Sequence, residues 1–308
     1  MELRNKREKL ILTYNSLKVL GQSTRTIEGL EKSLKNERGS KIVKIITVNI
    51  NKGGTGKSTI SYTFAKWLTQ VKKKKVLLVD GDHSCNLSYS FSCDSSTSIL
   101  GVFTKENVEI HNVGENLDFI RGSEHLEDNT LDLKSKQNNC MLLYMWIADN
   151  IEKLQEYDYM IIDTHNDTSL VTSNFLAVAD IVLGVSEPSR NGFRAWLELG
   201  ETIDYLKKEL VDIMSRQTYV TATPYLVANK VDHISNSSKQ FIDMAKEQPN
   251  YIGMIQKKEL LVKTLLEDTS IFEMKEKMSK KEQERHEKFY DHIDEVFSKV
   301  IEIADKTN

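Results

Sequence analysis

A short loop rich in glycine and lysine, residues 51–59, carries the clearest chemistry in the sequence. It reads Asn-Lys-Gly-Gly-Thr-Gly-Lys-Ser-Thr, and it lies between an apolar run ending at Ile50 and a segment with the apolar spacing of a helix. Glycines let the backbone turn so that successive N–H groups face phosphate oxygens, and a following helix N-terminus adds partial positive charge. The order of strand, loop and helix therefore predicts a site for a nucleoside triphosphate or its diphosphate.

Individual residues of this loop have expected contacts. Lys57 is expected to reach the β- and γ-phosphates, and the Ser58 hydroxyl is placed to ligate Mg²⁺. The rest of the cradle is expected to come from Gly53, Gly54, Thr55, Gly56 and Thr59. A glycine-rich turn with an incidental lysine is the alternative, and the ordered context disfavours it.

Two aspartates follow the apolar run 76–79. Asp80 and Asp82 are two residues apart, so at a strand end both side chains point the same way. Ligands of open α/β sheets bind at the carboxyl ends of the strands, and we expect the pair to lie there. A solvated acidic turn is the alternative interpretation.

The elements that must position these residues alternate between strands and helices. Apolar, β-rich runs occur at 42–50, 76–79, 159–162, 181–185 and 225–227, and helical segments lie between them. This alternation predicts an α/β fold, with a mostly parallel P-loop sheet covered by helices on both faces. A long helix is expected over 279–305, with one apolar face formed by Phe289, Ile293, Phe297, Val300 and Ile301.

Composition excludes several classes of protein. The 308 residues include only 14 Gly and 3 Pro, which is too few for a collagen-like or low-complexity chain. No run approaches the ~18 apolar residues of a membrane-spanning helix, and no apolar signal core follows the N-terminus. The three cysteines form no C-x-x-C pair, which suits a reducing compartment. We therefore expect a cytoplasmic protein.

Two regions are expected along the chain: a helical extension over 1–40 and a P-loop domain over 41–308. Within the extension, Ile11, Tyr14, Leu17 and Leu20 have the spacing of one helical face. A turn at 21–24 separates this helix from a second one. An arm for dimerisation is the favoured interpretation, while specific DNA contact and a partner-binding peptide stay open.

The phosphate loop departs from the plain G-x-x-x-x-G-K-[ST] pattern, because it has no first glycine and opens with a second lysine, Lys52. The sequence K-G-G-x-G-K-S resembles the deviant Walker A loop of the ParA/MinD family of ATPases. The resemblance implies that Lys52 reaches across a dimer interface to the partner's nucleotide, so that ATP binding and homodimer formation are one event. A cation delivered in this way neutralises charge on the transferred phosphoryl group, as an arginine finger does.

The resemblance extends to both strands that end in carboxylates. By resemblance, Asp82 orients the attacking water and Asp80 supports the site near Mg²⁺. The run 157–164 resembles a Walker B strand, so Asp163 would hold Mg²⁺ through a water. The family usually has Pro-Gln where this chain has His83-Ser84, and two prolines in place of His165-Asn166. Each histidine alone is typical of a solvated loop, and the departures leave the rate of hydrolysis open.

The run 225–232 ends in N-K-x-D, which admits two interpretations. By itself this pattern matches the guanine-reading motif of small GTPases. Beside the deviant P-loop, Asn229 resembles the asparagine that contacts adenine in the ParA/MinD family. We therefore expect ATP/ADP with Mg²⁺ as the cofactors, and GTP remains the alternative.

Within the family, a ParA-type plasmid or chromosome partition ATPase is the favoured branch. The tail 300–306 carries acids and no cationic face, unlike the membrane-binding helix of MinD-type members, so no membrane contact is expected. The resemblance implies an ATP-bound dimer on nonspecific DNA of the nucleoid, released when a centromere-binding partner protein stimulates hydrolysis. A MinD-like positioning ATPase and a nucleotide-gated DNA-binding regulator with little hydrolysis are the alternatives.

Nonspecific DNA binding needs Lys and Arg on one face of the dimer, because the net charge of the chain is −3. The candidates lie in the second half of the chain: Arg190, Arg194, Lys207, Lys208, Arg216, Lys257, Lys258 and Lys263.

Overall fold

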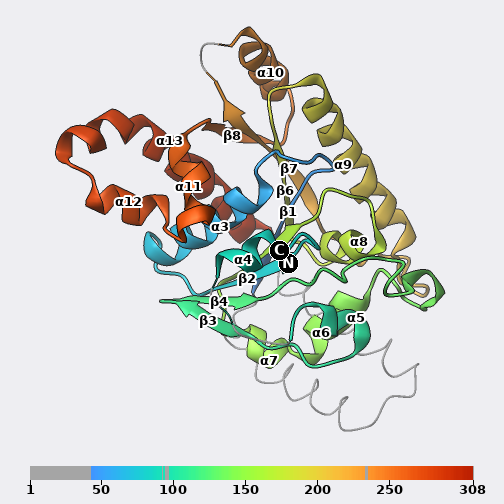
Figure 1. Cartoon of the computed structure of the whole chain (residues 1–308). Helices are drawn as coiled ribbons and strands as arrows, with labels where there is room; N and C mark the ends of the chain where they lie inside the picture. The colour runs from blue at the N-terminus through green and yellow to red at the C-terminus, as the bar shows by residue number, and fades with distance from the viewer. Residues whose placement is uncertain (1–42, 92, 94–96, 233–234, 308) are drawn as a thin grey trace.

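The computed structural model describes residues 43–91, 93, 97–232 and 235–307, which fold around one central sheet (Figure 1). The predicted helical extension over 1–40 lies outside these residues and stays a prediction. No helix within the described ranges is both long and apolar enough to cross a membrane.

The sheet of the described residues has eight strands in the order β3-β4-β2-β5-β1-β6-β7-β8. All neighbouring pairs are parallel except β3 and β4. The strands are β1 Lys44–Asn49, β2 Val76–Gly81, β3 His111–Gly114, β4 Leu117–Ile120, β5 Tyr159–Thr164, β6 Ile181–Ser186, β7 Thr223–Val231 and β8 Tyr251–Gln256. This arrangement confirms the predicted α/β fold class.

The central strands are continuous apolar runs because both faces of the sheet are covered. Every residue of β2, β5 and β6 is buried. Each of the five predicted runs overlaps an observed strand. The sequence reading missed β3, β4 and β8, and two of these are edge strands with partly exposed residues and a weaker apolar signal.

Two layers of helices sandwich the sheet (Figure 1). One face is covered by α3 Lys57–Gln70, α11 Glu259–Glu267, α12 Ile271–Lys277 and α13 Lys280–Lys306, with the short α4 Asn86–Ser90 beside α11. The other face is covered by α5 Leu100–Thr104, α6 Leu142–Asp149, α7 Ile151–Leu154, α8 Leu170–Ala177, α9 Arg190–Glu209 and α10 Asn236–Lys246. A short 3-10 turn, η1, spans Leu133–Ser135.

The long C-terminal helix predicted over 279–305 is confirmed as α13, which begins with a capping box between Ser279 and Glu282. Its apolar face is buried in the core rather than presented to solvent. The Phe297 ring lies 4.8 Å from Phe64 and 5.6 Å from Trp67, centroid to centroid. The helix thereby locks α3, and with it the loop that precedes α3, onto the sheet.

We expect Phe297→Ala to lower the free energy of unfolding by about 3–5 kcal/mol, because it leaves a cavity between α3 and α13. Chemical denaturation followed by circular dichroism measures this loss. Leu266→Ala is the matched control, since the Leu266 side chain is 79% exposed and its truncation should change stability by less than about 0.5 kcal/mol. Equal losses in the two variants would contradict the packing role.

Candidate nucleotide-binding site

The predicted site residues converge at the carboxyl edge of the sheet, where β1, β2, β5 and β7 all end. The parallel register pairs Asp80 of β2 with Asp163 of β5, although 83 positions separate them in the sequence. Val48 of β1 lies opposite Asp163 on the other side of β5. The loop that leaves β1 therefore begins next to Asp163, and Asp80 lies one strand further on.

The glycines of the loop give it a shape that other residues resist. Gly54 has φ +73° and Gly56 has φ +94°, both in the left-handed region. A Cβ on Gly56 would lie 2.6 Å from Asn229 Nδ2. Asn229 Nδ2 donates to the Thr55 carbonyl at 2.8 Å, and Lys230 Nζ donates to the Gly54 carbonyl at 2.5 Å. The end of β7 thus holds the loop in its phosphate-cradling form.

Lys57 is the first residue of α3, and its cationic side chain is buried. Burial lowers its pKa below the ordinary value, while the nearby charges of Asp163, Asp82 and Asp167 act in the opposite sense. A cation that has lost its water is favoured to interact with an anionic phosphate. This position matches the expected contact with the β- and γ-phosphates.

Asp163 is fully buried at the end of β5. Burial raises its pKa to about 7, the charge of Asp80 adds to the rise, and hydrogen bonding from Ser58 opposes it. Ser61 Oγ donates to Oδ1 at 2.9 Å, whereas Oδ2 has no hydrogen-bond partner among the described residues. A buried oxygen without a partner is costly, and a hard cation held by Ser58 and Asp163 would satisfy it. These residues therefore fit the expected Mg²⁺.

Asp80 is buried as well, and its oxygens are engaged by the turn after β2. Asp82 N donates to Oδ1 at 3.1 Å, while Ser88 N and Ser88 Oγ donate to Oδ2 at 2.8 and 2.7 Å. Burial raises the pKa of Asp80 to about 6 despite these hydrogen bonds. These hydrogen bonds give Asp80 a structural role, because they shape the turn that carries Asp82. A contribution of Asp80 to the metal site stays a prediction.

Asp82 borders the nucleotide pocket and is surrounded by donors. Burial acts to raise its pKa, but hydrogen bonds from Ser84 N at 2.7 Å and His165 Nδ1 at 2.8 Å bring the net pKa below the ordinary value. Asp82 is therefore a carboxylate at neutral pH. A carboxylate in this place can accept a hydrogen bond from a water that attacks a phosphate.

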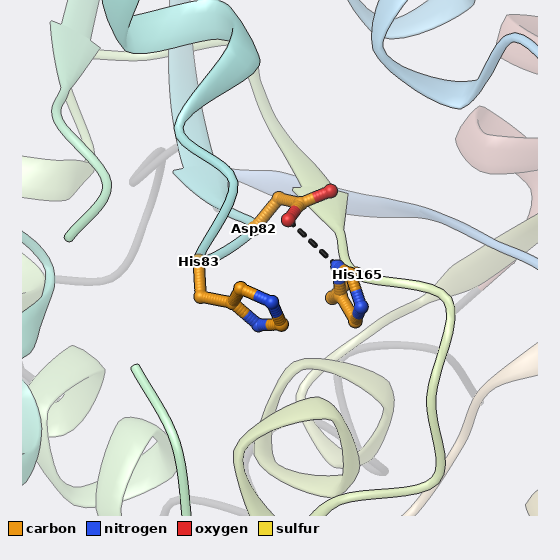
Figure 2. A group of neighbouring side chains, drawn as sticks. All are labelled: Asp82, His83 and His165. Carbon is orange, nitrogen blue, oxygen red and sulfur yellow. Dashed lines mark hydrogen bonds and ion pairs between the residues drawn. The ribbon is translucent and has the colours of Figure 1, made fainter. Parts of the chain in front are cut away.

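His83 and His165, which the sequence presents as two separate loop residues, lie side by side near Asp82 with their rings tilted by 36° (Figure 2). Their ring centroids are 3.9 Å apart. Sequence reasoning treated each as solvated and missed the pairing. The strand register explains this pairing. Gly81 pairs with Thr164, so the residues that follow them leave neighbouring strands at the same level.

Lys52, the lysine that opens the loop, is held by residues that follow β6. Its ammonium group forms an ion pair with Glu187 and contacts Ser189 Oγ at 3.2 Å. The residues lining the pocket include Glu187 but not Lys52. Lys52 therefore lies at the rim of the site, engaged by Glu187.

The pocket itself has a volume of about 950 Å³ and runs from the loop to the start of α11. Gly54–Thr59 and Asp82 line one part, and Asn229 lines another. Asn229 Oδ1 and Thr55 Oγ1 have no hydrogen-bond partner within the described residues. Asn229 Oδ1 is thus a buried acceptor without a donor from these residues, and the predicted contact of Asn229 with adenine stays a prediction.

The eight predicted DNA-contacting residues fall into separate groups. Lys257 and Lys258 line the candidate nucleotide pocket. Lys263 is exposed on α11, and Arg216 is exposed in the segment after α9. The remaining four lie at the two ends of α9, about 25 Å apart by the rise of a helix: Arg190, Arg194, Lys207 and Lys208.

The buried charge of Asp163 predicts a pH-dependent effect of Asp163→Asn on the protein without nucleotide or Mg²⁺. Because the folded pKa of about 7 lies above that of the unfolded chain, the native state binds the extra proton, and wild-type stability falls as pH rises from about 4 to 7. Asp163→Asn has no carboxyl group to titrate at this position, so it lacks this pH-dependent loss of stability. We expect it to melt above wild type at about pH 8, with a gap that narrows toward about pH 5.

Differential scanning fluorimetry across this pH range measures the gap. Asp204→Asn is the control, because Asp204 is exposed on α9 and its replacement should leave a small difference that does not change with pH. A gap that stays constant for Asp163→Asn would contradict the buried-charge explanation.

Comparisons with known proteins agree with this geometry. The family model of the AAA domain matches residues 43–216. A virulence plasmid ParA family protein of Chlamydia psittaci is 33% identical over 140 residues, which is 43% of this chain and 52% of the relative. The chain thus spans about half the length of that curated relative.

Solved structures share the fold. A plasmid partition protein of Borrelia burgdorferi bound to AMPPNP has a TM-score of 0.65 at 22% identity, covering 86% of this chain and 100% of that one. The septum site-determining protein MinD of Pyrococcus horikoshii with Mg-ADP has a TM-score of 0.61 at 18% identity, covering 87% and 99%. The sequence match, the loop and the sheet lead to one assignment: this chain belongs to the AAA domain family and is a ParA/MinD-type P-loop protein.

Proposed function

We propose that this protein is an ATP-dependent partition ATPase, in which an ATP-bound homodimer binds nonspecific DNA and hydrolysis releases it. One observation carries the proposal: buried Lys57, Asp163 and Asp82 meet at one sheet edge, while Lys52 of the same loop is engaged by Glu187 and does not line the pocket. A single chain therefore holds the phosphate-binding and water-orienting groups but leaves the second lysine for another chain.

Within the site each side chain has a separate task. Lys57 holds the β- and γ-phosphates, Ser58 and Asp163 hold Mg²⁺, and Asp82 orients the attacking water. Mg²⁺, when bound, neutralises charge on the phosphate oxygens. Asn229 selects the base by accepting a hydrogen bond through its free Oδ1. The solved neighbours hold AMPPNP and Mg-ADP, which supports adenine over the guanine alternative.

The ion pair between Lys52 and Glu187 supports a coupling between nucleotide state and assembly. Both side chains are partly exposed, 21% for Lys52 and 32% for Glu187, so the pair is weak and exchangeable. Lys52 can exchange Glu187 for the γ-phosphate of a nucleotide bound to a second chain, because that phosphate carries negative charge. Charge neutralisation across the dimer then accompanies assembly.

The surface of α9 supports DNA as the cargo. Arg190 and Arg194 are exposed and one helical turn apart, although Arg194 also pairs with Glu198. α13, by contrast, has its apolar face packed against the sheet, which disfavours the membrane-positioning alternative. A centromere-binding partner protein that stimulates hydrolysis belongs to the same proposal, as does a location on the nucleoid.

Lys52→Ala is expected to bind ATP with wild-type affinity but to remain monomeric with ATP and Mg²⁺, because the lysine does not line its own pocket. Light scattering measures the dimer, and a fluorescent ATP analogue measures binding. Lys57→Ala is the contrasting variant and should lose nucleotide binding by at least about 100-fold, since it leaves the phosphates without their buried cation. An ATP-dependent dimer in Lys52→Ala would remove its role in trans.

Binding to mixed-sequence duplex DNA tests the cargo. We expect binding with ATP and Mg²⁺ only, with a steep loss of affinity as salt rises. The double variant Arg190→Ala and Arg194→Ala should bind more weakly and show a shallower salt slope, while Lys134→Ala, an exposed lysine outside α9, should behave as wild type.

Absent or nucleotide-independent DNA binding would overturn the partition reading. Co-sedimentation with anionic liposomes would then test the positioning ATPase. Single-turnover ATP hydrolysis separates the third candidate, a nucleotide-gated regulator, which would bind DNA with ATP but hardly hydrolyse it.

A further inference from the structure

His83 and His165 lie beside Asp82 and bring two imidazole rings close to one carboxylate. One potential ligand atom each from Asp82, His83 and His165 lies within 4.8 Å of the other two. Among the described residues the structure holds no other group of three His, Cys, Asp or Glu side chains placed so closely. Figure 2 shows both rings on the same side of the Asp82 carboxylate.

The donor set is of the kind that binds transition metals. Two imidazole nitrogens and one carboxylate oxygen suit Zn²⁺ and similar borderline ions, whereas Mg²⁺ prefers oxygen ligands alone. The Mg²⁺ expected in the nucleotide site would be held by Ser58 and Asp163. The histidine group is therefore a different kind of site, sharing only the neighbourhood of Asp82.

The local structure favours three ligands at once. Asp82 is 7% exposed and His165 is 21% exposed, so the ligands are shielded but reachable by a small ion. Neighbouring strands β2 and β5 hold their backbones in fixed register. The rings need only a small movement, since ligand atoms bound to one tetrahedral Zn²⁺ at about 2.0–2.2 Å lie about 3.4 Å apart.

His165 and His83 differ in their other contacts. His165 Nδ1 contacts Asp82 Oδ1 at 2.8 Å. The ring can bind a metal ion through its other nitrogen, Nε2, or through Nδ1 if the ion replaces this contact. The His83 ring forms no hydrogen bond with any side chain or backbone group that the structure describes. A metal ion would supply both rings with a partner.

We propose that Asp82, His83 and His165 form a binding site for a single divalent transition-metal ion of the Zn²⁺ type, with the remaining coordination position open to water. Binding of the ion draws Asp82 away from the attacking water. The site then acts as an inhibitory switch on hydrolysis; this consequence, unlike metal binding itself, rests on the proposed ATPase function.

Isothermal titration of untagged, full-length, nucleotide-free protein with Zn²⁺ tests the site directly. We expect one high-affinity equivalent in wild type, and affinity at least about tenfold weaker in His83→Gln and in His165→Gln. Glutamine keeps much of the side-chain bulk, and circular dichroism confirms that each variant is folded. His125→Gln replaces an exposed histidine elsewhere and should bind as wild type.

Titration with Co²⁺ supplies a spectroscopic readout that a purely structural role would not move. The visible absorption of tetrahedrally bound Co²⁺ should appear in wild type and in His125→Gln, and it should be absent in the double variant of His83 and His165. Wild-type Zn²⁺ affinity in that double variant would overturn the proposal, as would the absence of a stoichiometric site in wild type.

A further arm separates this proposal from the proposed function. In single-turnover assays with Mg²⁺ and ATP, one equivalent of Zn²⁺ should slow hydrolysis by wild type at least about tenfold more than hydrolysis by His83→Gln. Stoichiometric Zn²⁺ binding without any hydrolysis to inhibit would leave the metal site standing and count against the ATPase. Equal inhibition of both proteins would contradict the proposal that this site acts as an inhibitory switch.

Discussion

Buried charge at the carboxyl edge of the sheet is the constraint on which the rest of the structure depends. Lys57, Asp80 and Asp163 are all buried within neighbouring elements, and one oxygen of Asp163 has no partner in the described part of the chain. Such groups are costly to bury, and the fold tolerates them because packing of α3 and α13 elsewhere offsets the cost. In the proposed function, phosphate and a cation would give these buried groups the partners that they lack in the chain itself.

The backbone is organised around the same need. Left-handed glycines aim the loop toward the phosphates, and Asn229 from β7 holds Thr55 in place. Asp80 shapes the turn of Asp82 rather than facing the pocket freely. Asp82, Asp163 and the Thr55 carbonyl each accept a hydrogen bond from a residue in a distant part of the sequence. The proposed ATPase activity needs preorganisation of this kind, because it acts by positioning and charge neutralisation.

In the proposed function, Lys52 connects the site to assembly. Its ion pair with Glu187 keeps a strongly hydrated cation near the protein surface, where exchange costs little. The two histidines lie at the same site, where His165 bonds the Asp82 carboxylate and the His83 ring packs against His165. Both features lie at the rim of the pocket. The rim, unlike the buried centre, is open to partners and ions.

Much of this protein could be predicted from the sequence because its strongest signals are local. The loop 51–59, the apolar strands and the long C-terminal helix depend on spacing and residue type alone, and the structure contains all of them. The edge strands β3 and β8 escaped prediction, since partly exposed strands have weak apolar patterns. The pairing of His83 with His165, the hold of Asn229 on Thr55 and the ion pair of Lys52 with Glu187 depend on strand order. Only the tertiary structure decided these contacts, because sequence spacing states which residues share a strand end but not which strands become neighbours.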